Sequence, residues 1–128
     1  MKGYIGNIEK ETLENTDYRR VLYTAKNSQL VLMSIEPGDE IGAEVHQLDQ
    51  FLRIEAGQCK AILDGVEHNI SDDFAVVVPA GMDHNFINTG DVPLKLYSIY
   101  SPPEHKDAIV QKTKADEFEE HFDGKTTE

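Results

Sequence analysis

The sequence predicts an all-β domain, a sandwich or barrel built from many short strands. Short runs rich in Val, Ile, Leu, Tyr and Phe alternate with turn segments through the middle of the chain. The turn segments contain Gly, Pro, Asn and Asp, whose backbone preferences favour turns. Many short strands at such regular spacing are typical of sandwiches and barrels. Neither an internal repeat nor a low-complexity linker interrupts the pattern.

The expected strands follow one another from a polar N-terminal segment to a pair of prolines. Residues 1–17 are mostly polar and predict an irregular lead-in or an added edge strand. Asp64 and Gly65 stand between two apolar runs and predict a two-residue hairpin. We expect strands at 20–25, 28–36, 41–46, 50–57, 58–65, 66–70, 74–79, 84–89 and 92–101.

The chain changes character after residue 101. Pro102 and Pro103 should end the last strand, because proline cannot donate to a strand ladder. Residues 113–122 begin like a capping box and carry two phenylalanines at helical spacing, which predicts a short acidic helix. We therefore expect a single domain over 1–128, with a barrel core at about 19–101, a polar lead-in over 1–17 and an acidic extension over 102–128.

Composition and charge limit the classes of function. The chain has 128 residues and is 39% hydrophobic, which suits one compact domain. Its single cysteine, Cys59, excludes an internal disulfide and fits a reducing compartment. A formal charge of −12 argues against nucleic acid and anionic membrane surfaces as partners. With no signal-peptide or membrane-helix pattern, we expect a cytoplasmic protein.

Polar residues at two-residue spacing stand in the expected strands. Glu44 and His46 are two apart and should share a face of a strand, and Gln50 begins the next strand. His84 opens another strand, with its face shared by Phe86 and Asn88. Polar groups directed into an apolar interior cost free energy unless they find partners. One metal ion would satisfy them together.

The first of these segments resembles the first motif of the cupin superfamily. In that motif a glycine is followed by two histidines, a glutamate and a second glycine at fixed spacings. The matching positions here are Gly38, Glu44, His46, Gln50 and Gly57, with every spacing kept and two ligand identities changed.

The second segment resembles the second cupin motif, of glycine, proline, glycine, histidine and asparagine. The matching positions are Asp73, Pro79, Gly81, His84 and Asn88, so that only the opening glycine is replaced. The two motifs together cover residues 38–88, and the chain looks like the small single-domain cupins called mannose-6-phosphate-isomerase-like. The resemblance implies a cupin-type double-stranded β-helix, a jelly-roll barrel whose interior holds the site, and a homodimer.

The resemblance also implies a ligand set for one divalent ion. Carried over position by position, the metal ligands are Glu44, His46, Gln50 and His84, and Glu44 is also the candidate catalytic residue. Cupin-type phosphomannose isomerases place a Gln, a Glu and two His on zinc. Two His and one carboxylate are also the facial triad of non-haem iron oxygenases. The donor types leave Zn, Fe, Mn and Ni open.

The expected pocket is apolar with a polar floor. Phe86, Asn88 and either Tyr97 or Tyr100 are its candidate walls. Arg53 and Lys60 are out of phase with the inward positions of their strands, so they should point away from the pocket, whereas Arg19 or Arg20 could reach into it. So few cations in the pocket weigh against a highly anionic substrate. His68, His105 and His121 lie outside both motifs and are expected at the surface.

These features predict a metal-dependent enzyme that acts on a small sugar-like or keto/enol metabolite. Three alternatives stay open: a non-haem iron dioxygenase-like cupin, a cupin that binds a small molecule without catalysis, and a barrel without metal that serves as a scaffold or dimer. Fold does not decide among them, because function depends on the site.

Overall fold

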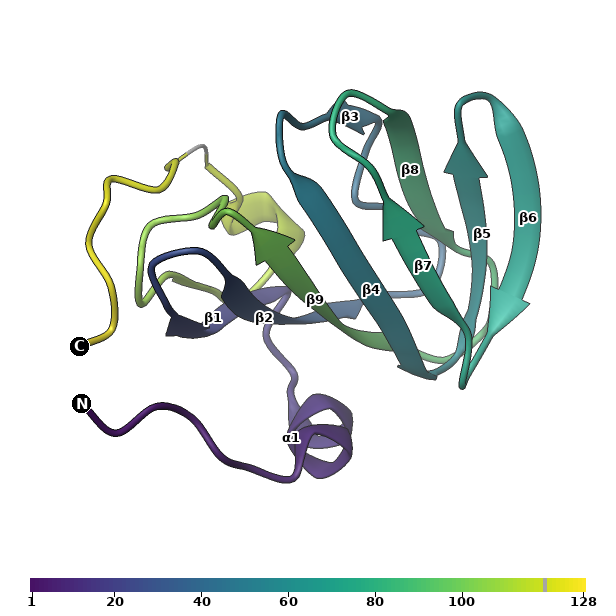
Figure 1. Cartoon of the computed structure of the whole chain (residues 1–128). Helices are drawn as coiled ribbons and strands as arrows, with labels where there is room; N and C mark the ends of the chain where they lie inside the picture. Colours follow the sequence, from purple (N-terminus) through teal and green to yellow (C-terminus); the bar gives the residue numbers. More distant parts are fainter. Residues whose placement is uncertain (119) are drawn as a thin grey trace.

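The computed structural model describes residues 1–118 and 120–128, and its strands form two antiparallel sheets packed face to face (Figure 1). The strands are β1 Arg19–Thr24, β2 Gln29–Ile35, β3 Glu44–Val45, β4 Asp49–Ala56, β5 Gln58–Leu63, β6 Val66–Ser71, β7 Ala75–Val78, β8 Asp83–Asn88, β9 Leu94–Ser101 and β10 Val110–Gln111. The larger sheet has the order β10-β1-β2-β9-β4-β7 and the smaller one β3-β8-β5-β6. The predicted jelly roll is confirmed, although the strand expected at 41–46 is reduced to Glu44–Val45.

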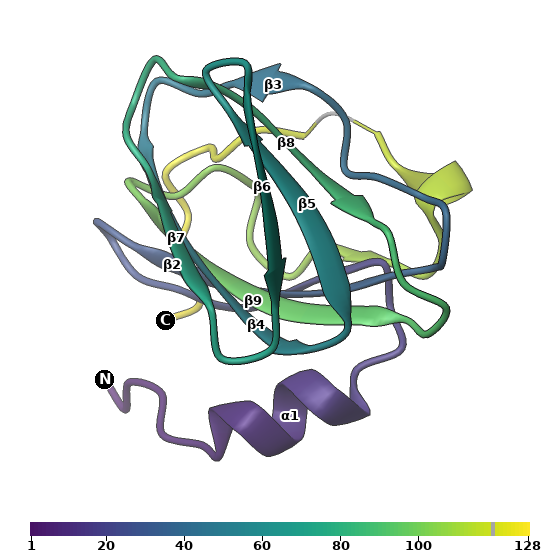
Figure 2. The ribbon, with the colours of Figure 1, turned by 90° about the vertical axis from the view of Figure 1, so that its right-hand side faces the viewer.

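The space between the sheets is filled by the inward positions of the strands. In β4, Gln50, Leu52 and Ile54 are buried and alternate with more exposed neighbours, as the period of two requires. β9 presents Leu94 and Leu96 to the same core. Seen from the side, β5, β6 and β8 cover one face of the larger sheet (Figure 2). The inward face of β4 thus carries one polar residue, Gln50, at the end where the site forms.

Two turns show why the sequence folds in this register. Asp64 and Gly65 have φ of 51° and 81°, the positive values that a two-residue hairpin turn of this type needs, and they join β5 to β6 as predicted. Gly57 has φ of 101°, and a Cβ there would lie 3.1 Å from the Leu94 backbone. A side chain at position 57 would therefore disturb the crossing from β4 to β5.

The N-terminal segment differs from its prediction. Residues 1–7 are irregular as expected, but Ile8–Glu14 form a helix, α1, which contacts β4 and β9. Asn7 caps it by accepting a hydrogen bond from the Lys10 amide at 3.1 Å. Seven residues with few apolar side chains give too weak a periodic signal to predict a helix. Among the described residues, no helix has the length and apolar character that crossing a membrane requires.

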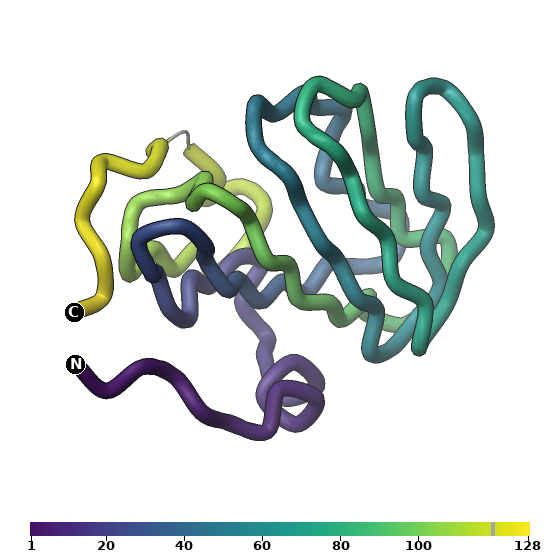
Figure 3. The backbone as a smooth tube through the Cα atoms, in the orientation of Figure 1, coloured from purple at the N-terminus to yellow at the C-terminus, as the bar shows by residue number. Residues whose placement is uncertain are grey.

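The C-terminal segment forms less helix than predicted. Residue 119 of the predicted helix lies outside the described residues; among the others of 113–122, only Lys114–Asp116 are helical, as one 3₁₀ turn with the expected capping box between Thr113 and Asp116. Before it, β10 pairs with β1, and after it the chain runs back along the large sheet (Figure 3). The two chain ends meet, since the Gly3 amide donates to Glu128 at 2.9 Å.

Candidate metal centre

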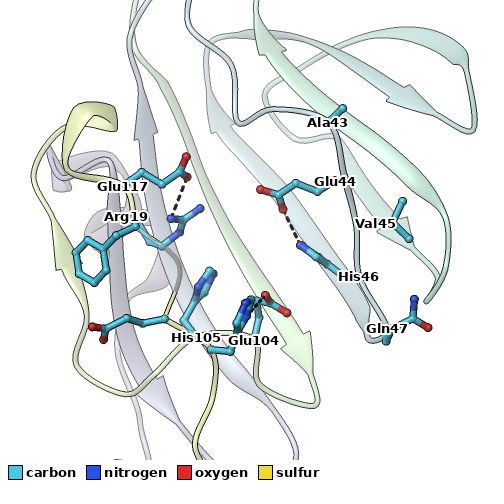
Figure 4. A pocket seen from close by; sticks show the side chains of 12 residues that line it. Arg19, Ala43, Glu44, Val45, His46, Gln47, Glu104, His105 and Glu117 are labelled. Atoms are coloured by element: carbon cyan, nitrogen blue, oxygen red, sulfur yellow. Dashed lines mark hydrogen bonds and ion pairs between the residues drawn. The ribbon is translucent and has the colours of Figure 1, made fainter.

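The structure brings three of the predicted ligands together. Glu44 on β3 lies directly opposite His84 on β8, and His46 follows β3 immediately. The ligand atoms of these three residues all lie within 4.8 Å of one another. Glu44 Oε2 and His46 Nε2 are 2.6 Å apart and point into the same space (Figure 4). Two segments almost 40 positions apart thus meet because β3 and β8 are neighbours in the smaller sheet.

The His84 ring is oriented by the backbone. Its Nδ1 lies 3.0 Å from the carbonyl oxygen of Met82, and a carbonyl can only accept a hydrogen bond. Nδ1 is therefore the donor in this contact, and Nε2 is the ring nitrogen that can face a metal ion. Such a carbonyl contact on the second ring nitrogen is the usual way in which proteins hold a histidine ligand in place.

Gln50, the fourth predicted ligand, is a further candidate donor. Its Nε2 donates to Ser98 Oγ at 3.1 Å and to Tyr100 OH at 3.4 Å, which fixes the amide. Its Oε1 is buried and has no hydrogen-bond partner among the described residues. An unpaired buried carbonyl oxygen costs free energy, and a cation would offset that cost. The donor set and this unpaired oxygen fit a divalent metal ion.

The charges of Glu44 and His46 stabilise each other. Burial opposes the ionisation of Glu44, but the hydrogen bond and charge of His46, with the charge of Arg19, outweigh it and lower the pKa of the carboxyl. Burial likewise opposes protonation of His46, yet the hydrogen bond and charge of Glu44 raise the pKa of the imidazole. Without a metal the two side chains form an ion pair, which keeps the two donor atoms close.

The site opens into a cavity of about 640 Å³. Residues 43–47 form one wall, and the opposite wall comes from β1 and the C-terminal segment (Figure 4). The cavity is lined by Arg19, Ala43, Glu44, Val45, His46, Gln47, Glu104, His105, Glu117, Phe118, Glu120 and His121. The expectation of an apolar pocket is therefore wrong: most of these side chains are polar or charged.

His105 is a correction to the sequence prediction, which placed it at the surface, whereas His121 is exposed as predicted. His105 lines the cavity, and its ring packs edge-on against Tyr100 at 5.3 Å between centroids. Burial, together with the positive charges of Arg19, His46 and His121, lowers the pKa of His105 to about 3. His121 keeps an exposed side chain but also lines the cavity, with Nδ1 3.2 Å from Glu104.

The predicted pocket residues lie in different places. Phe86 is buried beside His84, with ring centroids 6.0 Å apart, and so packs beneath the candidate ligands. Asn88 is used by the backbone: its amide donates to the carbonyls of Ile35 and Val92 at 2.8 and 2.9 Å. The structure therefore brings Phe86 to the site but leaves Asn88 at the opposite end of β8.

The two candidate tyrosines lie on opposite faces of β9. Tyr97 packs against Phe51 on the outer face, with centroids 6.2 Å apart, and does not reach the cavity. Tyr100 is buried and lies 6.0 Å from the His46 ring. Its parity with Leu94 and Leu96 was the sequence signal that could have chosen it over Tyr97.

Arg19 lines the wall of the cavity that lies opposite Glu44 and His46. It is 5% exposed and lies on the inward face of β1, in phase with Val21. That parity could have selected Arg19 over Arg20 from the sequence. The glutamates of the C-terminal segment had no such signal, because they lie outside regular strands.

Comparison with known proteins agrees with this geometry. Residues 31–100 match the family model of the cupin domain. The uncharacterized protein YrkC of Bacillus subtilis (strain 168) is 47% identical over 122 residues, 90% of this chain and 66% of that protein. The uncharacterized protein L612 of Acanthamoeba polyphaga mimivirus is 42% identical over 107 residues, 80% of this chain and 67% of that protein. The chain thus spans about two thirds of the length of these curated relatives.

A solved structure extends the likeness to the whole fold. The crystal structure of BH2720 from Bacillus halodurans has a TM-score of 0.88 and 44% sequence identity, and the match covers 90% of this chain and 92% of that chain. The family model covers more than half of this chain, and the two motifs of the candidate site fall within it. The chain belongs to the cupin superfamily.

Proposed function

We propose that this cupin binds one divalent metal ion through Glu44, His46, Gln50 and His84, and acts as a metal-dependent enzyme on a small sugar-like or keto/enol metabolite. One observation carries the proposal: three donor atoms from two distant segments converge within 4.8 Å beside a cavity of about 640 Å³. Clefts of this size commonly hold small molecules. The unpaired oxygen of Gln50 adds the fourth donor.

The side chains around the site would have distinct roles. A bound ion would act as a Lewis acid on an oxygen of the substrate. Glu44 is ionised and 34% exposed in its side chain, so that it can hold a proton of the substrate as well as serve as a ligand. Burial raises the pKa of Tyr100, which therefore stays protonated and orients the Gln50 amide. His105 is neutral and shapes the far wall without adding charge.

The donor set supports two reaction classes. Gln, Glu and two His are the donors of cupin-type phosphomannose isomerases, which would imply aldose–ketose exchange on zinc or manganese. Two His and one carboxylate equally suit a non-haem iron dioxygenase. The metal found in the purified protein decides which assay follows: aldose–ketose exchange for zinc or manganese, and oxygen consumption with diketones for iron. Tight binding without turnover would instead indicate a binding module.

The surroundings of the protein are part of the proposal. We infer a cytoplasmic homodimer whose partners are small molecules rather than nucleic acid or membranes. The charge of −12 supports the exclusion of polyanionic partners. The edge strands β6 and β7 carry exposed Val66 and Val77, and such edges invite pairing with a second copy. Light scattering of the purified protein tests the dimer.

Metal analysis of ligand variants tests the site itself. His46→Ala and His84→Ala should each reduce metal affinity at least about 100-fold while keeping the β-rich fold, because each removes a direct ligand. His68→Ala is the matched control, since His68 lies exposed on β6. Normal metal content in both ligand variants would remove the proposed centre, and loss of metal in the control would show that the assay reports general damage.

A further inference from the structure

The wall opposite Glu44 and His46 carries a carboxylate that is held by three donors. Glu117 Oε2 lies 3.1 Å from Arg19 Nη1 and accepts a hydrogen bond from Tyr18 OH at 3.0 Å. Its second oxygen, Oε1, lies 3.8 Å from Lys114 Nζ. Burial raises the pKa of Tyr18, which keeps the hydroxyl protonated as a donor. Two cations and a hydroxyl around one carboxylate are the usual chemistry of carboxylate recognition.

The Arg19 guanidinium is fixed and still has an unused donor. Its Nη1 also donates to Gln111 Oε1 at 2.8 Å, so the group is held in place independently of Glu117. Its Nε is buried without a hydrogen-bond partner among the described residues. Arg19 is also the only Lys or Arg among the residues that line the cavity. Figure 4 shows its guanidinium facing Glu44 across the open space.

Glu117, by contrast, is held on a lightly packed segment. It follows directly on the single 3₁₀ turn Lys114–Asp116, and the next residue, Phe118, is 51% exposed. The Glu117 side chain is itself 30% exposed. Segments with few buried apolar contacts open at low free-energy cost. An external carboxylate could therefore replace that of Glu117 without disturbing the sheets.

We infer that Arg19 and Tyr18 form the subsite for a carboxylate of the substrate, and that Glu117 occupies this subsite in the free protein. The inference rests on the proposed function and narrows it: the substrate is a small keto or enol acid, with its oxygens at the metal centre and its carboxylate on Arg19.

The charges of the cavity favour a single carboxylate over a phosphate ester. Among the described residues, four glutamates line the cavity: Glu44, Glu104, Glu117 and Glu120. A monoanion that takes the place of the Glu117 carboxylate leaves the net charge around Arg19 unchanged. A phosphate dianion would add a further negative charge among carboxylates with no second lining Lys or Arg to balance it.

Calorimetric titration with 4-oxopentanoate and its neutral amide tests the subsite. The two probes share the ketone and the carbon chain, and the amide lacks the negative charge and replaces one acceptor oxygen by an NH₂ donor. In Glu117→Gln the acid should bind about tenfold more tightly than in the wild type, because the competing carboxylate is gone. In Arg19→Lys it should bind about tenfold more weakly, because the planar fork is lost. Affinity for the amide should stay constant.

Glu120→Gln is the matched control. It removes the same charge from the same cavity, but Glu120 pairs with Lys106 at 3.7 Å rather than with Arg19. Equal tightening in Glu120→Gln and Glu117→Gln would overturn the inference in favour of a general charge effect. Two further results would also overturn the inference: equal affinity of Glu117→Gln for the acid and the amide, or no binding of the acid.

The metal content of each sample separates this inference from the proposed function. Wild-type protein without metal would contradict the proposed centre. In His84→Ala, which should lose the metal, the ratio of the affinities for acid and amide would still report on the Arg19 subsite alone. Loss of that preference only in Arg19→Lys, with metal content unchanged, supports the subsite.

Discussion

The two walls of the cavity are built in different ways. The wall that carries Glu44, His46 and His84 belongs to paired strands β3 and β8, and it is backed by the buried ring of Phe86. The opposite wall comes mostly from the irregular segment after residue 101, which is held by ion pairs and a single 3₁₀ turn. Strand pairing fixes the donor atoms of a metal centre tightly, whereas a lightly packed wall can adapt to a substrate. Substitutions at matched positions in the two walls test this contrast.

The largest expected difference is between two phenylalanines. Phe86→Ala, in the strand wall, should lower the free energy of unfolding by about 3–5 kcal/mol, because it empties a fully buried site. Phe118→Ala, in the C-terminal wall, should change it by less than about 0.5 kcal/mol, because the ring is 51% exposed. Urea denaturation of both variants measures the difference. Similar losses would show that the C-terminal wall is packed as firmly as the sheet.

A second pair compares two glutamines beside the site. Gln50→Met should weaken metal binding about 10–100-fold, because it removes the unpaired buried oxygen while nearly keeping the volume. Gln47→Met, at an exposed lining position, should leave metal affinity unchanged. Competition with a chromogenic chelator measures both. If Gln50→Met binds metal normally, Gln50 only supports Tyr100 and Ser98.

The buried imidazole of the far wall should make stability depend on pH. His105 has a pKa of about 3 in the fold against an ordinary value of 6.5, so between these values the unfolded chain binds a proton that the folded chain does not. The fold is therefore fully stable with respect to His105 above pH 6.5, where the ring is neutral in both states. As the pH falls below 6.5, protonation of His105 in the unfolded chain lowers the free energy of unfolding. Between pH 7 and pH 5 the loss is about 2 kcal/mol.

Comparison of variants isolates that contribution. Chemical denaturation of metal-free protein at several pH values should show a smaller loss on acidification in His105→Phe than in the wild type. His68→Gln, at an exposed position on β6, should keep the wild-type dependence. Parallel pH curves for His105→Phe and wild type would contradict the burial of a neutral imidazole.

The smallest expected effect concerns the ion pair that anchors the C-terminal wall. Glu117→Gln should lower the free energy of unfolding by about 0.5–1 kcal/mol, because the partner Arg19 is buried but Glu117 is part-exposed. Glu67→Gln breaks the more exposed pair with Lys60 on the outer strands and should cost about 0–0.5 kcal/mol. A loss of several kcal/mol in Glu117→Gln would mean that Glu117 is a structural residue and not a displaceable occupant.

Much of the fold follows from local rules that the sequence states directly. Side chains alternate between the two faces of each strand, and in β4 this alternation directs Gln50, Leu52 and Ile54 into the core. Asp64 and Gly65 specified their hairpin because few residues accept positive φ at both positions. Helix α1 and the short 3₁₀ turn were not predicted correctly, because a few residues with little periodicity carry a weak signal.

The sequence by itself determined the strands, their inward faces and a family motif that names four candidate ligands. Only the tertiary structure decided which distant side chains meet: Glu44 opposite His84, and Arg19 beside Glu117 on the far wall of the cavity. The physical reason is that alternation is a property of each strand alone. The order of strands in a sheet, and the path of an irregular C-terminal segment over it, depend on the packing of the whole chain.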